Sequence, residues 1–318
     1  MRDHIESPCG LRFMFEQLEL QAGYTRRWML DQPMMQTGEE IAQAYATLRR
    51  FVDFVGRADT PYINTLQFRL QGLKDIRTTI KNLSQNAVLD DIELFEVKHL
   101  AILAVDVAER LRNHGLDDAV EIPDLNEVIT ILDPDGLKMA TFYVYDSYCQ
   151  ELRDLRSQMR QHPEQQEELL LECAEIEEGV RRDLSKQLHP FAKALEAAQV
   201  ALAKIDVNLA KALQMKQLGL CFPSISNDDA TRYEGLFHPQ VKDALEKTKK
   251  RFQPVTLEFG LKPTLITGAN MGGKTVVLKT LTLCQYLFQY GFGIPASKAE
   301  IAVKDGIYFC IGDEQSIE

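Results

Sequence analysis

The sequence lacks long apolar runs and an excess of positive charge. Its longest apolar stretches, such as residues 100–108, fall well short of the roughly 20 residues that a membrane-spanning helix needs. The first ten residues contain no apolar core of a secretory signal, so we expect no export. The chain has 36 basic and 47 acidic residues, a formal net charge of −11. Duplex DNA repels such a surface, so any nucleic-acid role requires a local basic patch.

Paired cysteines are also missing. No C-x-x-C pair occurs, which argues against disulfides and zinc and predicts free, buried thiols in a reducing, cytoplasmic compartment. With 45% hydrophobic and 26% charged residues, the 318-residue chain has the composition of a soluble protein of two or three domains. The six cysteines are Cys9, Cys149, Cys173, Cys221, Cys284 and Cys310.

Helical periodicity dominates the first 220 residues. Apolar residues recur every three or four positions in residues 39–55, 72–83 and 90–112, which predicts helices with one face in a core. Residues 148–218 have few helix breakers, and their second half predicts a long helix with a narrow apolar seam. That seam consists of Leu195, Ala198, Leu202, Ile205, Leu209 and Leu213.

Two stretches interrupt this helical pattern. Residues 121–146 combine prolines, the turn signal "DPDG" and β-branched and aromatic residues, which predicts a short strand or hairpin. Residues 164–178 contain seven acidic residues and no basic one, a pattern typical of a solvated helix face.

A second domain is expected from Cys221 onward. Residues 1–220 then form a mainly α-helical domain, and residues 221–318, where short apolar runs alternate with turn residues, form part of an α/β domain.

A phosphate-binding loop stands inside this second domain. Residues 268–275, "GANMGGKT", fit the complete P-loop (Walker A) pattern G-x-x-x-x-G-K-[ST], between a predicted strand at 264–267 and a predicted helix at 276–287. Glycines allow backbone N–H groups to turn toward phosphate oxygens, and the helix N-terminus adds the positive end of its dipole. Lys274 would reach the β- and γ-phosphates, and the Thr275 hydroxyl would hold Mg²⁺. The candidate site comprises Gly268, Asn270, Met271, Gly272, Gly273, Lys274, Thr275 and Val276.

Hydrolysis of ATP also requires an acidic residue at the end of another strand and a group that orients water. Asp313 and Glu314 follow the loop too soon for that strand in a doubly wound sheet, and acids beside a glycine are more often turn residues. We therefore assign no catalytic residue and expect little turnover from this chain.

The residues of this loop match a sequence pattern that is more specific than the general P-loop motif. "TGANMGGKTVVLKT" resembles the MutS family of ABC-type ATPases. "LFHPQV" at 236–241, residues 290–315, and the N-terminal segment 23–52 are also similar to MutS segments in the same order. The resemblance covers nearly the whole chain, and it implies a helical core and lever at 1–220 followed by the N-terminal part of a P-loop ATPase domain at 221–318. It also implies that Phe252, an aromatic shortly before the loop, stacks on adenine; packing at the domain edge is the other interpretation.

The chain departs from the MutS pattern in several ways. No mismatch-reading domain with a Phe-x-Glu wedge precedes the core, and the region where a DNA clamp is expected is short and acidic. The acidic Mg²⁺ strand and the far side of the ATPase sheet are missing, so we expect that the chain stops inside its ATPase domain.

Three functions remain open. The resemblance implies an ATP-dependent switch that acts on mismatched or recombining DNA, with Mg²⁺ as cofactor and a homodimer in the full-length form. The acidic composition favours a related ATPase that acts on a protein partner, as a motor or reactivating chaperone, without DNA. The third is an ATP-binding fragment with no activity of its own.

Overall fold

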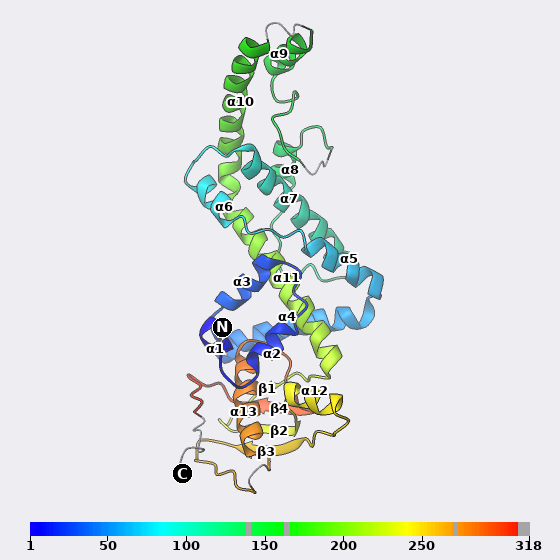
Figure 1. Ribbon diagram of the computed structural model, residues 1–318, viewed down its shortest axis with the longest axis vertical. Helices are drawn as coiled ribbons and strands as arrows, with labels where there is room; N and C mark the ends of the chain where they lie inside the picture. The colour runs from blue at the N-terminus through cyan, green and yellow to red at the C-terminus, as the bar shows by residue number, and fades with distance from the viewer. Residues whose placement is uncertain (138–140, 162–165, 270–271, 311–318) are drawn as a thin grey trace. The chain divides into compact units, whose positions relative to one another are not determined.

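The computed structural model describes residues 1–137, 141–161, 166–269 and 272–310 (Figure 1). The chain forms two compact units. The first unit contains Met1–Leu20, Arg26–Asp59 and the chain from Val207 onward, and the second contains Gln21–Thr25 and Thr60–Asp206. The predicted boundary between residues 220 and 221 is a division by type of secondary structure and stays a prediction.

Helix is the only regular secondary structure in the described part of the second unit. This unit contains α5 (Thr60–Leu70), α6 (Arg77–Ser84), α7 (Asp91–Arg112), α8 (Asn126–Leu132), α9 (Gln150–Gln161), α10 (Gln166–Leu188), the 3₁₀ turn η2 (His189–Phe191) and the first part of α11 (Ala192–Leu218). The helix α7 begins with a capping box, because Asp90 accepts the Glu93 N–H at 2.8 Å and the Glu93 carboxylate accepts the Asp90 N–H at 3.1 Å. This helix confirms the prediction for residues 90–112.

The hairpin predicted in residues 121–146 is wrong. The described part of this segment contains the short helix α8 and irregular chain, and no strand. Aromatic residues of this segment pack in a core instead. Tyr145 is buried, and its hydroxyl lies 3.1 Å from the Lys98 Nζ. Lys98 also donates to the Asp133 carboxylate at 2.9 Å, and both side chains are 1% exposed. A segment rich in aromatic residues can therefore be buried without pairing as a strand.

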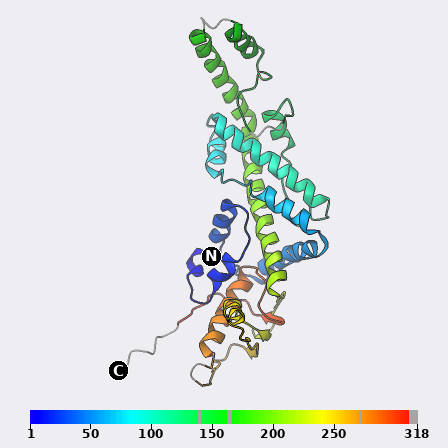
Figure 2. The same ribbon diagram turned by 45° about the vertical axis from the view of Figure 1, so that its right-hand side comes forward.

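The helices α9 and α10 lie side by side in both ribbon views (Figure 2). Their shared core is built around buried Val144, Leu152 and Cys173, with Leu155 and Ile176 packed against it. The expected helical region 148–218 is confirmed for its described residues by α9, α10 and α11.

The first unit combines helices with a small mixed sheet. Its helices are α1 (Arg2–Ile5), α2 (Leu11–Glu16), most of α3 (Gly23–Asp31), α4 (Gly38–Arg57), the last part of α11, α12 (Pro239–Lys247) and α13 (Lys274–Gln289). The strands are β1 (Ser224–Ile225), β2 (Thr231–Leu236), β3 (Val255–Phe259) and β4 (Lys298–Ile301), in the order β1-β4-β2-β3. β1 is parallel to β4, and the other two pairs are antiparallel.

Helix α4 confirms the prediction for residues 39–55. Thr37 and Glu40 form a capping box at its start, and the hydrogen bonds from the backbone of Gln36 and Thr37 lower the pKa of Glu40. Its buried face contains Ile41, Tyr45 and Leu48.

Helix α11 is buried on more sides than a narrow seam. Leu195, Leu202 and Leu209 are buried as predicted, but so are Ala203, Val207 and Lys211 on other sides of the helix. The second half of α11 is therefore enclosed well beyond the predicted seam.

The six cysteines are free, as expected, although Cys310 is exposed and Cys149 and Cys221 are only partly buried. Within the described residues, no helix has both the length and the apolarity to cross a membrane.

Candidate functional site

The phosphate loop leads directly into α13. Gly273 is the N-cap of this helix at φ +86°, in the left-handed region that favours glycine, and Lys274 is the first helical residue. At Gly272 a Cβ atom would lie 2.9 Å from the Ala269 carbonyl oxygen, so a side chain there would force the loop open. Two of the motif's glycines are thus required by backbone geometry.

Lys274 lies across its own loop. Its Nζ donates to the Gly268 carbonyl at 2.5 Å and to the Ala269 carbonyl at 3.1 Å. The Gly272 N–H closes the turn on the Ala269 carbonyl at 3.0 Å. Both lysine acceptors are neutral, and phosphate oxygens would replace them with stronger, charge-assisted acceptors. The loop is therefore suited to a polyphosphate, because the Lys274 ammonium group already lies against the loop backbone.

The remaining predicted loop residues surround this lysine. Thr275 is exposed in the first turn of α13, where its hydroxyl can reach a cation bound to phosphate, and Val276 is half-buried. Asn270 and Met271 lie outside the described residues, as do Asp313 and Glu314. The described residues contain no group of three or more His, Cys, Asp or Glu side chains that could hold a metal ion.

The strand expected at residues 264–267 is not formed. These residues have no strand partner among β1, β2, β3 and β4, and Leu265 is 85% exposed. An extended segment becomes a strand only when a neighbour takes its backbone hydrogen bonds, and here none does. The loop is consequently reached through exposed chain.

Phe252, the predicted adenine contact, is half-buried three residues before β3. Its exposed neighbours Lys249, Lys250 and Arg251 make this approach basic although the chain is acidic. Both interpretations of Phe252, adenine stacking and edge packing, agree with this position.

The far end of α13 is held by buried polar side chains that the sequence analysis missed. Tyr45 donates to the Phe292 carbonyl at 2.7 Å, and Lys211 Nζ donates to the Tyr290 carbonyl at 2.7 Å. Gln289 donates to the carbonyls of Met35 and Lys304, both at 2.8 Å. The sequence did contain a signal for the burial of Lys211. Val207 and Met215 lie four residues before and after it, and residues at this spacing share a helix face, so a lysine between two apolar residues indicates a buried ammonium group.

Burial without a carboxylate partner sets the chemistry of Lys211. Its Nζ lies 4.5 Å from the centre of the Phe292 ring, and burial lowers its pKa to about 7. Tyr45 is also fully enclosed, and burial raises its pKa well above the usual value. Both groups donate to backbone carbonyls at the C-terminal end of α13.

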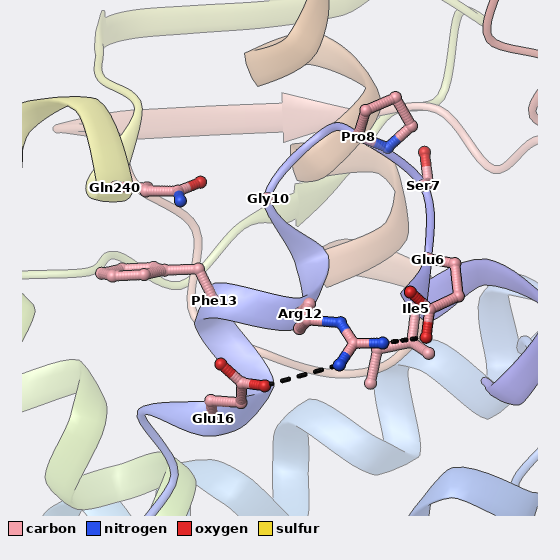
Figure 3. Close-up of a pocket in the computed structure, with 9 residues that line it drawn as sticks. All are labelled: Ile5, Glu6, Ser7, Pro8, Gly10, Arg12, Phe13, Glu16 and Gln240. Atoms are coloured by element: carbon pink, nitrogen blue, oxygen red, sulfur yellow. Dashed lines mark hydrogen bonds and ion pairs between the residues drawn. The ribbon is translucent and has the colours of Figure 1, made fainter.

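A separate hollow of about 290 Å³ lies near the N-terminus (Figure 3). Arg12 points between two carboxylates there, pairing with Glu6 and, at 3.7 Å, with Glu16. Its one lining arginine is already paired with both lining carboxylates, and the hollow contains no residue of the phosphate loop. Its lining consists of Ile5, Glu6, Ser7, Pro8, Gly10, Arg12, Phe13, Glu16 and Gln240.

Comparison with known proteins supports the assignment of the loop region. The family model for MutS domain V matches residues 264–318. MutS domain V is an ATPase domain, so residues 264–318 are similar to part of an ATPase domain.

Curated relatives extend the similarity. "Endonuclease MutS2" of Streptococcus equi subsp. equi is 37% identical over 142 residues, 44% of this chain and 17% of the relative. The protein of the same name from Thermus thermophilus is 38% identical over 144 residues, 44% of this chain and 18% of the relative. That from Caldicellulosiruptor bescii is 26% identical over 249 residues, 77% of this chain and 30% of the relative. These matches support membership of the MutS family, and the matched part of the chain spans less than a third of these relatives' length.

Proposed function

We propose that the chain binds ATP with Mg²⁺ through the loop at residues 268–275 and acts as an ATP-driven conformational switch. The observation that carries this proposal is the position of Lys274, whose Nζ lies on the carbonyls of Gly268 and Ala269 at the N-terminus of α13. The match of residues 264–318 to MutS domain V supports it.

Each loop residue has a role in this proposal. Backbone N–H groups of Gly268, Asn270, Met271, Gly272 and Gly273 surround the phosphates, and those of Lys274, Thr275 and Val276 complete the helix N-terminus. The Lys274 ammonium neutralises the β- and γ-phosphates, and the Thr275 hydroxyl binds Mg²⁺. Phe252 stacks on adenine.

For the whole protein we propose a role in DNA mismatch repair or recombination as a homodimer, as in its family. Curated relatives named "Endonuclease MutS2" support this assignment. A second candidate, an ATPase that acts on a protein partner without DNA, is favoured by the net charge of −11 and by the acidic residues of α10.

Replacement of Lys274 tests the nucleotide proposal most directly. Lys274→Ala should weaken ATP binding at least tenfold in calorimetry, because hydrogen bonds to charged groups contribute about 1.5–3 kcal/mol. Lys262→Ala, at an exposed lysine on the approach to the loop, is the matched control and should bind as the original chain does. Equal affinity of the Lys274 variant would refute the loop assignment.

The role of Phe252 is tested separately with two ligands. If Phe252 stacks on adenine, Phe252→Ala should weaken ATP binding by about 1 kcal/mol but leave inorganic triphosphate binding unchanged. An equal loss for both ligands would mean that Phe252 supports the fold of the site.

Duplex DNA distinguishes the two roles of the whole protein. Labelled matched and mismatched duplexes should be titrated at low and moderate salt, with and without ATP. Tight, salt-sensitive binding supports repair or recombination, and absence of binding at low salt supports the protein-partner role.

A further inference from the structure

The outer face of α10 presents leucines among glutamates. Leu170 is 50% exposed and Leu171 is 71% exposed, and Glu172 and Glu175 are exposed beside them. The acidic run was interpreted from sequence as a solvated helix face. Leu170 and Leu171 place a small apolar patch inside this acidic face, and an apolar patch rimmed by polar residues is the form that a binding surface takes.

The described core between α9 and α10 does not cover Leu171. The opposite face of α10 packs on α9 through Cys173, Ile176 and Val180. A helix turns by about 100° per residue, so Leu171 points about 160° away from Cys173. Leu171 therefore cannot turn into the shared core.

The charges around the leucines are uncompensated. Two arginines of this pair are engaged elsewhere: Arg156 binds Asp146 and Glu177, and Arg181 binds Asp91 and Glu178. Arg182 is exposed on α10 two turns beyond Glu175 and makes no ion pair with a described residue. Among the described residues, Glu172 and Glu175 have no ion pair. The face formed by Leu170, Leu171, Glu172, Ala174 and Glu175, the α10 acidic face, is both apolar and negative.

We infer that the α10 acidic face binds a basic amphipathic helix of a partner protein. Leu171, Ala174 and Glu175 recur at three- and four-residue spacing, so they present one stripe that a second helix can lie along. Leucines of the partner would cover Leu170 and Leu171, and its lysines or arginines would pair with Glu172 and Glu175. The inference does not depend on ATP binding.

Charge distinguishes this occupant from two others. DNA phosphates would face uncompensated carboxylates and be repelled. A second copy that met this face symmetrically would bring glutamate against glutamate. A basic helix gains from both the leucines and the carboxylates.

The test uses the 318-residue chain and a labelled synthetic peptide of 16 residues, with lysines on one helical face and leucines on the other. A scrambled peptide of the same composition removes the amphipathic pattern and keeps the charge. Fluorescence anisotropy should show that the ordered peptide binds at least tenfold tighter than the scrambled one, and that its affinity falls with salt.

Two double variants locate the binding. Leu170→Ser with Leu171→Ser and Glu172→Lys with Glu175→Lys should each weaken the ordered peptide at least tenfold, and the second should also reduce the salt dependence. Phe68→Ser with Ile92→Ser removes residues of 67% and 70% exposure elsewhere in the second unit, and should leave binding unchanged. Glu109→Lys with Glu196→Lys makes the same charge change at exposed sites and should have little effect.

Three results would overturn the inference. Unchanged peptide binding by both α10 variants would place the peptide elsewhere. Binding of labelled duplex DNA to the chain itself, if the leucine substitutions weaken it, would assign the face to nucleic acid. Self-association of the chain that the leucine substitutions abolish, seen by sedimentation, would assign it to a second copy.

Discussion

Each unit buries one lysine among its described residues, and the two lysines have opposite surroundings. In the second unit, Lys98 on α7 meets the Asp133 carboxylate at 2.9 Å and the Tyr145 hydroxyl at 3.1 Å. In the first unit, Lys211 on α11 meets the Tyr290 carbonyl and the face of Phe292, and no carboxylate of the described residues lies within ion-pair distance. A buried ammonium group stays protonated at low free-energy cost only when an opposite charge lies beside it. Lys211 instead has a pKa lowered to about 7 by burial.

The largest effect is expected when Lys98, like Lys211, has no carboxylate partner. Asp133→Asn leaves the lysine without its counter-charge and should destabilise the second unit by about 3–5 kcal/mol. Hydrogen exchange of the α7 and α8 amides measures this loss directly. Asp135→Asn, at an exposed acid two residues later, is the control and should change exchange little.

The double variant Lys98→Met with Asp133→Leu sharpens this result. Removal of both charges should recover most of the lost stability, because a buried pair replaced by apolar side chains costs little. Exchange as fast as in the single variant would show that the contacts of Asp133 outside the pair matter more than its charge.

A smaller effect is expected from the titration of Lys211. The unfolded lysine has an ordinary pKa near 10.5 and the folded one a pKa of about 7, so the folded state binds fewer protons between these values. The free energy of unfolding of the first unit should therefore rise with pH, by about 2 kcal/mol between pH 7 and pH 9. Urea unfolding followed by Trp28, the only tryptophan and a residue of the first unit, measures it.

Lys211→Met isolates this contribution. The variant keeps a side chain of similar length and should lose the rise with pH that Lys211 supplies. Buried thiols and tyrosines titrate alike in both proteins, so the difference between the two pH profiles belongs to Lys211. Parallel profiles would mean that water or movement solvates the lysine.

The smallest effect concerns a third, exposed lysine. Lys249 closes α12 at φ +57°, where the Lys250 N–H binds the Leu245 carbonyl at 2.8 Å. Glycine adopts this left-handed conformation without Cβ strain, so Lys249→Gly should stabilise the first unit by up to about 1 kcal/mol. Lys250→Gly, at a neighbour without positive φ, should give no gain, and an equal gain from both would point to charge instead of strain.

Features that depend on residues close together in the chain could be predicted from the sequence. Helices α4, α7, α11 and α13 could be predicted because their apolar spacing is local, and the capping pairs Thr37–Glu40 and Asp90–Glu93 offered a further local signal. The glycines and lysine of the phosphate loop could also be predicted, because the motif specifies backbone geometry within a few residues.

Features that depend on distant partners could not be predicted. The run at 264–267 has the composition of a strand, but a strand also needs a neighbour. Residues 141–148 are also rich in strand-forming residues, but Tyr145 of this segment packs against Lys98 instead of pairing in a sheet. The exposure of Leu171 is set by which side of α10 faces α9, which the acidic run alone does not indicate.

The two ends of α13 differ in a way that bears on mechanics. From Leu283 to Gln289 every residue is buried, whereas Thr275 and Leu278 near the start are exposed. A helix of 16 residues is a stiff rod of about 24 Å. Because Tyr45, Lys211 and Gln289 hold its far end, this rod behaves as a cantilever whose free tip is the phosphate loop. A load applied at the tip produces its greatest bending moment where the buried part begins at Leu283, about 14 Å from Lys274.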